Sequence, residues 1–215
     1  MGQKEHTKII NKVAKQIFKP EGLVRKGQSR TWYHDKGWFT TVVSFEPSKS
    51  RRGTYLSIGV NFHWYEKDYF SYDIGGREQG FVEFSTDAEF TPKIEEMVGF
   101  ALTKAIFYSE KLSNLTTAKP FILSHQFTSD SLWGNYHKGI TSGLLGDVEN
   151  SKTYFSALLN FEDGRDISWI SDLKRKAQTL IELVDKTDDL NSHIFGIINR
   201  TRARKKLKEV EVELR

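Results

Sequence analysis

Alternating apolar and polar residues between Arg30 and Trp64 predict a β-hairpin around which the rest of the chain is organised. The second half of this stretch places large apolar side chains at every other position: Leu56, Ile58, Val60, Phe62 and Trp64. A strand with this alternation buries one face and turns the other toward water, a loop or a partner. The other face carries Tyr55, Asn61 and His63, which we expect to be exposed.

Further runs of apolar, aromatic and β-branched residues predict the partners of this strand. Two runs precede it, at residues 23–34 and 38–45, and one follows it at residues 79–85. Asp35-Lys36-Gly37 predicts a tight turn, and the polar, basic segment from Pro47 to Gly53 predicts an exposed hairpin end. Together these runs predict an antiparallel four-stranded β-meander.

Apolar residues at helical spacing lie on both sides of the meander. Those between Ile9 and Phe18 end just before Pro20, which stops a helix. Those between Ile94 and Ile106 follow Thr91, a candidate N-cap, and Pro92, a residue suited to a first helical turn, and this helix should extend to Lys111. The N-terminal and central helices should cover the apolar face of the sheet, which predicts an α+β domain over residues 1–112.

The C-terminal half has a different pattern, because helical periodicity replaces strand alternation. Residues 113–120 favour a linker, and three apolar patterns at 154–159, 170–184 and 190–198 predict helices. Thr187 and the two aspartates after it predict the start of the last helix. Residues 113–215 are therefore expected to form a mainly helical portion, either separate from the first domain or packed with it.

One segment resembles a known family. The run from Lys19 to Gly27, followed by Arg30-Thr31-Trp32-Tyr33 and Ser50-Arg51-Arg52-Gly53, resembles the entry segment of an uncharacterised bacterial domain-of-unknown-function family. In that family a helix leads through a Gly-x-x-basic-basic-Gly type entry into an aromatic antiparallel meander. Leu23 stands where that family has an aromatic residue. The resemblance covers the first half of the chain, implies an α+β fold in a bacterial protein, and brings no catalytic residues.

Composition removes several kinds of chemistry. The 215 residues include no cysteine, which excludes disulfides, thiolate catalysis and cysteine-ligated metals. The six histidines show no metal-ligand spacing, and no phosphate-binding loop or nucleophile elbow is present. We therefore predict no catalytic residues, no metal site and no cofactor, and we favour a non-enzymatic protein. Without an apolar signal core or a run of about 18 apolar residues, we expect a cytoplasmic protein with no membrane association.

Charge adds one candidate binding surface. The net charge of +4 is small, but six basic residues without an acid between them end the last helical pattern: Arg200, Arg202, Arg204, Lys205, Lys206 and Lys208. Such a run can bind phosphates, or it can be a solvated helix end.

We predict a non-catalytic binding or interaction module for another protein, of an immunity or regulatory type. Its candidate surface is formed by Tyr55, Asn61 and His63. A nucleic-acid-associated protein that uses the basic run is the alternative, and a hydrolytic enzyme is a third reading.

Overall fold

The computed structural model describes residues 5–162, 164 and 167–212, and the chain divides into two compact units. Unit 1 contains the described chain from Glu5 to His63, Lys67–Glu110 and Lys205–Glu211. Unit 2 contains, of the described residues, Trp64–Glu66, those within Lys111–Arg204, and Val212. Residues 205–211, which the sequence places in the C-terminal portion, thus cluster with the first unit. The predicted boundary at residue 112 stays a prediction.

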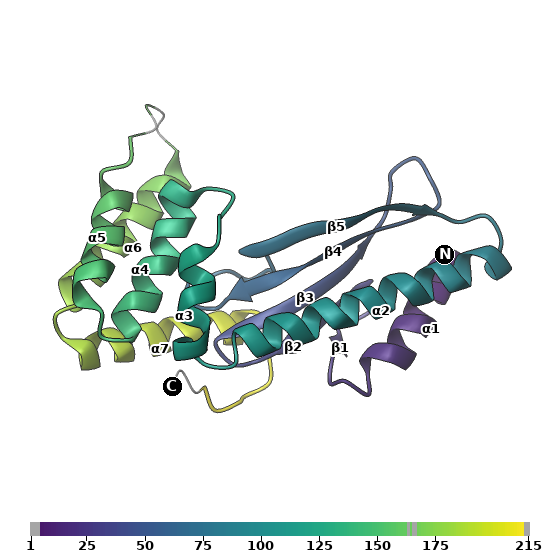
Figure 1. The fold of residues 1–215 in the computed structure, drawn as a ribbon, viewed down its shortest axis with the longest axis horizontal. Helices are drawn as coiled ribbons and strands as arrows, with labels where there is room; N and C mark the ends of the chain where they lie inside the picture. Colours follow the sequence, from purple (N-terminus) through teal and green to yellow (C-terminus); the bar gives the residue numbers. More distant parts are fainter. Residues whose placement is uncertain (1–4, 163, 165–166, 213–215) are drawn as a thin grey trace. The chain divides into compact units, whose positions relative to one another are not determined.

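Unit 1 is an α+β fold, as predicted, built on one antiparallel sheet (Figure 1). The sheet has five strands in sequence order rather than four: β1 (Val24–Arg25), β2 (Thr31–Asp35), β3 (Phe39–Glu46), β4 (Gly53–Phe62) and β5 (Ile74–Glu83). The difference arises in the first predicted strand, which a turn divides into β1 and β2. In this turn Gly27 has a φ of 56°, and the Lys26 N–H donates to the Thr31 carbonyl.

Two helices belong to unit 1, α1 (Glu5–Phe18) and α2 (Asp87–Lys111), and Figure 1 shows both beside the sheet. The Phe18 ring lies against Trp32 and Phe45, so α1 packs on the apolar face to which Leu56 and Ile58 also belong. The start predicted for α2 is wrong, since Thr86 caps it by accepting from the Glu89 N–H. Each large apolar side chain buried here contributes about 1.5–3 kcal/mol.

The opposite face of the sheet is covered in part by the chain that follows β4. We call Lys67–Asp73 the covering loop. Its Phe70 ring lies 5.3 Å from the Tyr33 ring. The strand beneath carries Gly59, where an added Cβ would stand 2.8 Å from Tyr72 Cδ1. A glycine at this position lets the loop lie directly on the sheet.

Unit 2 is helical. Its elements are α3 (Leu115–Ser124), the π-helical turn η1 (Asp130–Gly134), α4 (Asn135–Leu144), α5 (Val148–Leu159), α6 (Ser168–Leu183) and α7 (Thr187–Arg204). The linker expected at 113–120 is instead the start of α3, because the Asn114 side chain accepts from the Thr117 N–H and caps it. α4 packs against α3, α5 and α7, and Gly139 lets the Phe155 ring approach its backbone.

The short segment Trp64–Glu66 completes unit 2. The Trp64 indole donates to His137 Nδ1 at 2.8 Å, and the Tyr136 hydroxyl donates to the Trp64 carbonyl at 3.1 Å. Trp64, Tyr136 and His137 are all buried. Among the described residues, no helix has the length and apolar character needed to cross a membrane. The expected cytoplasmic location stays a prediction.

Candidate functional site

The structure separates the three residues predicted to form an exposed binding face. Tyr55 is partly exposed, whereas Asn61 and His63 have no exposed surface. The expected exposure is therefore wrong for Asn61 and His63. The covering loop and Lys205 enclose Asn61, and the two ring nitrogens of His63 are hydrogen-bonded to the Thr40 hydroxyl and the Gly37 carbonyl.

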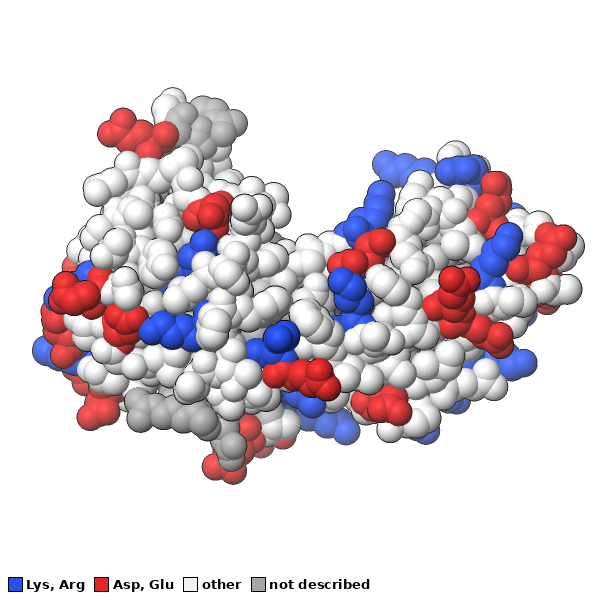
Figure 2. Space-filling view, in the orientation of Figure 1, with Lys and Arg blue, Asp and Glu red and all other residues white. Residues whose placement is uncertain are grey.

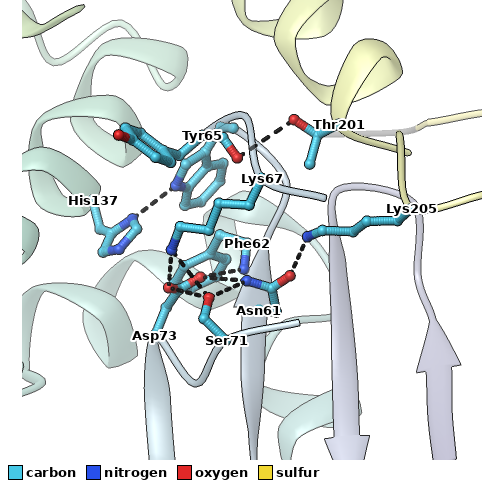
Figure 3. A network of polar contacts seen from close by, with 10 residues as sticks. Asn61, Phe62, Tyr65, Lys67, Ser71, Asp73, His137, Thr201 and Lys205 are labelled. Carbon is cyan, nitrogen blue, oxygen red and sulfur yellow. Dashed lines mark hydrogen bonds and ion pairs between the residues drawn. The ribbon is translucent and has the colours of Figure 1, made fainter. Parts of the chain in front are cut away.

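Asn61 lies instead at the centre of a buried polar network (Figure 3). Its amide nitrogen donates to Ser71 Oγ at 2.8 Å and to Asp73 Oδ2 at 3.0 Å. Lys67 pairs with Asp73 from within the covering loop, with 3.2 Å between Nζ and Oδ1. On the other side of Asn61, the Lys205 ammonium group donates to its Oδ1. One asparagine side chain thus joins β4, the covering loop and the C-terminal segment.

Lys205 is a titratable group of this network with a strongly shifted pKa. Burial lowers the pKa of Lys205 to about 7; the Asp73 carboxylate opposes this shift, and Lys67 and Lys26 add to it. Lysines with lowered pKa values can act as bases or nucleophiles. The Lys205 amine, however, is buried and donates a hydrogen bond to Asn61. This arrangement is typical of a structural contact, one that holds Lys205–Glu211 on the sheet.

Tyr55 belongs to a different feature, which we call the arginine–aromatic stack: Arg77, Tyr55, Phe81 and Arg51. The Arg77 guanidinium lies 4.2 Å from the Tyr55 ring, Tyr55 lies 4.9 Å from Phe81, and Arg51 lies 4.3 Å from the Phe81 ring. The two aromatic rings are therefore held between two cations.

Strand register explains where this stack forms. Tyr55 is paired with Glu46, and Arg77 is paired with Ser57, so both side chains project from the face opposite the helices. Thr54 is paired with Val82, which sets Phe81 beside Tyr55, and the register shifts on both sides of Leu56 keep Arg77 on the same face. Glu46 pairs with Arg77 at 2.9 Å, and this ion pair helps to fix the guanidinium group over the Tyr55 ring.

The strand that carries half of the stack is an edge of the sheet. β5 pairs with β4 alone, and no other strand in the described ranges 5–162, 164 and 167–212 pairs with its outer side. The segment Ser50–Arg52 at the neighbouring hairpin tip is exposed, and Figure 2 shows lysine and arginine side chains gathered over this tip, at the upper right. An edge strand beside a basic, aromatic surface can accept an extended peptide.

The six residues of the basic run at the end of α7 differ in their exposure and in their ion pairs. Arg202 and Lys205 are buried, with 4% and 7% of their surfaces exposed. Arg200 and Arg204 both bind the Glu66 carboxylate, at 2.7 and 2.9 Å. Lys206 and Lys208 are exposed. The six residues therefore do not present one continuous surface for phosphates.

Two features of unit 1 cannot be predicted from the sequence alone. The role of Lys205 depends on contacts across more than 140 positions, as its pairing with Asn61 shows, and no local pattern indicates them. The spacing of Arg77 and Phe81 in the sequence places both on one face of β5, but their approach to Tyr55 depends on how β5 pairs with β4. No group of histidine, aspartate and glutamate side chains in the described part of the chain is arranged to hold a metal ion.

Comparisons with known proteins give no relative for this chain. No family model, curated protein or solved structure matches it. The resemblance of its first half to an uncharacterised bacterial family stays a prediction.

Proposed function

We propose that this chain is a non-catalytic binding module that captures an extended segment of a protein partner at the arginine–aromatic stack and the adjoining edge of β5. The observation that carries the proposal is the alternation of Arg77, Tyr55, Phe81 and Arg51 on the sheet face that the covering loop leaves open. Tyrosine, phenylalanine and arginine are enriched at the centres of protein interfaces.

Three further features of this surface favour the binding of a partner: ordered side chains, an open strand edge and positive charge. Its side chains are already ordered by mutual stacking and by the Arg77–Glu46 and Arg51–Glu83 ion pairs, so a partner loses less conformational entropy in ordering them. The free backbone groups of an edge strand supply main-chain hydrogen bonds to an added strand. Exposed Lys49, Arg51 and Arg52 at the hairpin tip favour a segment that carries acidic residues.

The nucleic-acid alternative has less support from the geometry. Its predicted contacts include Arg202 and Lys205, which are buried, and Arg200 and Arg204, which share one carboxylate. Reversal of such residues would change stability as well as surface charge. The proposal of a protein partner therefore rests on the stack and not on the basic run.

Selection from a library of random peptides tests this proposal, with the full-length chain as the target. We expect enrichment of acidic peptides of extended conformation, whose affinity is then measured by fluorescence anisotropy. Tyr55→Ala should weaken binding by at least about tenfold, corresponding to ~1.4 kcal/mol.

Tyr69→Ala is the matched control, because Tyr69 belongs to the same unit and is 57% exposed but lies outside the stack. This variant should bind as the wild type does. Equal losses in the two tyrosine variants, or no enriched peptide at all, would contradict the proposal.

A further inference from the structure

A pocket of about 190 Å³ lies within unit 2, between α6, α7 and the segment that contains Tyr65 and Glu66. Its volume is below the roughly 300 Å³ at which pockets for drug-sized ligands begin, so it suits a small molecule. Its lining combines apolar and charged side chains: Tyr65, Glu66, Tyr136, Arg175, Lys176, Thr179, Leu180, His193, Ile197 and Arg200.

The charges that line this pocket are mainly positive. Arg175, Lys176 and Arg200 are cations, and Glu66 is the carboxylate among the lining residues. Asp172, on α6 outside the lining, pairs with Arg175 and Lys176 and fixes them in place. The Tyr65 hydroxyl donates to the same aspartate at 3.0 Å. Cations that are held by neighbours in this way are ordered before a ligand arrives.

Arg200 is the best-placed donor. Its Nε donates to Glu66 Oε1 at 2.7 Å, and its two terminal nitrogens make no hydrogen bond to any residue in the described part of the chain. The Glu66 carboxylate therefore orients the guanidinium group while leaving these N–H groups for a ligand. A planar guanidinium group binds the oxygens of phosphates and carboxylates through two parallel hydrogen bonds.

His193 lies on the same helix, three residues before Gly196 and seven before Arg200. Burial lowers the pKa of His193, and the charge of Arg200 lowers it further. The charged groups around it are Arg200 on α7, Arg175 and Lys176 on α6, and Glu66. A bound anion would offset this positive field and raise the pKa of His193.

We propose that the pocket of unit 2 binds a small molecule through an oxyanion group, a phosphate or a carboxylate, with Arg200 as the main anchor. Lys176 and Arg175 add charge from α6, and Leu180 and Ile197 offer contact to a short apolar part of the ligand. This site shares no residue with the arginine–aromatic stack. Its test therefore does not depend on the proposed protein-binding function.

Titration calorimetry with inorganic phosphate, and in a second series with acetate, tests the proposal on the full-length chain and distinguishes the two kinds of oxyanion. Arg200→Gln should weaken binding of the preferred anion by about tenfold or more, in line with the loss of a charge-assisted hydrogen bond. Arg204→Gln is the matched control, since Arg204 binds the same Glu66 carboxylate but does not line the pocket. It should change the affinity by less than about threefold, an effect of general charge.

Proton NMR of the His193 ring gives a second measurement that does not depend on the heat of binding. Saturation with the anion should raise the pKa of His193 in the wild type and should leave it unchanged in Arg200→Gln. Absence of binding by both anions at millimolar concentration would overturn the proposal. Equal losses in Arg200→Gln and Arg204→Gln would also overturn it, because they would show an attraction to net charge without a site.

Discussion

At the scale of single residues, Lys205 shows how a charged side chain becomes part of a core. Lys205 has only 7% of its surface exposed, and its ammonium group donates to Asn61, which has no exposed surface. Desolvation disfavours the charged form, so the pKa falls from an ordinary value of about 10.4 to about 7. The same burial removes Lys205 from the surface that the sequence predicts for the basic run.

This lowered pKa predicts a dependence of stability on pH. Between about pH 7 and pH 10.4 the unfolded chain binds a proton at Lys205 that the folded chain has released, so the free energy of unfolding should rise with pH across this window. Below about pH 7 the penalty of charging Lys205 is fully present. The rise should amount to at most roughly 3–5 kcal/mol.

Urea denaturation at several pH values measures this effect. Lys205→Met removes the titrating group and should flatten the curve between pH 7 and pH 10, whereas Lys206→Met, at an exposed neighbouring position, should leave it unchanged. A wild-type curve that is already flat in this range would show that Lys205 keeps its ordinary pKa in the folded state.

At the scale of elements, the contact of the covering loop with β4 depends on glycine. An alanine Cβ at position 59 would stand 2.3 Å from the Ile74 carbonyl oxygen and 2.8 Å from Tyr72 Cδ1. Neither backbone nor a packed ring can move away without cost. Gly59→Ala should therefore destabilise the protein by about 2–4 kcal/mol.

Gly80→Ala is the control for this prediction, because Gly80 lies in β5 of the same sheet and an added Cβ there meets nothing within 4 Å. Its effect should stay within about 1 kcal/mol. Thermal unfolding of the two variants provides the comparison. Similar melting temperatures for both would mean that neither the Ile74 carbonyl group nor the covering loop lies closely on Gly59.

Element types could be predicted from the sequence where a local pattern determines them. The end of α1 before Pro20 and the end of α2 at Lys111 agree with their apolar periodicity. Long-range contacts could not be predicted. The alternation in β4 indicates two faces correctly, but it does not show that Asn61 and His63 are covered, because that depends on a loop and a lysine distant in sequence.

The same limit applies to the candidate site. Tyr55 was identified from its place in the strand, whereas its stacking with Arg77 and Phe81 requires the register of β5, which starts at Ile74 rather than near Gln79. The start of α2 differs from the prediction for another reason. Thr86 and Thr91 both precede apolar periodicity, and the choice between two possible caps depends on tertiary contacts such as that of Phe84 with Phe90.

At the scale of the whole molecule, unit 1 is assembled from segments that are far apart in the chain. Its sheet and helices are complete by residue 111, but Lys205–Glu211 also belong to it. A fragment that ends at residue 113 therefore keeps the apolar core and loses the partner of Asn61 Oδ1. An unsatisfied buried acceptor costs about 1–3 kcal/mol.

We expect the fragment of residues 1–113 to be soluble and to unfold cooperatively, because its core of two helices on a sheet is intact.

The melting temperature of this fragment should lie about 5–15 °C below that of the same fragment extended by a flexible glycine–serine linker and residues 205–212. The Lys205→Ala form of the extended fragment should melt like the short one, since it lacks the ammonium group that Asn61 accepts from. Differential scanning calorimetry of the three proteins gives the comparison. Aggregation or non-cooperative unfolding of the extended fragment would show that unit 1 requires unit 2 to fold. Equal melting temperatures of all three proteins would show that Lys205 does not stabilise the contact of the C-terminal segment with the sheet.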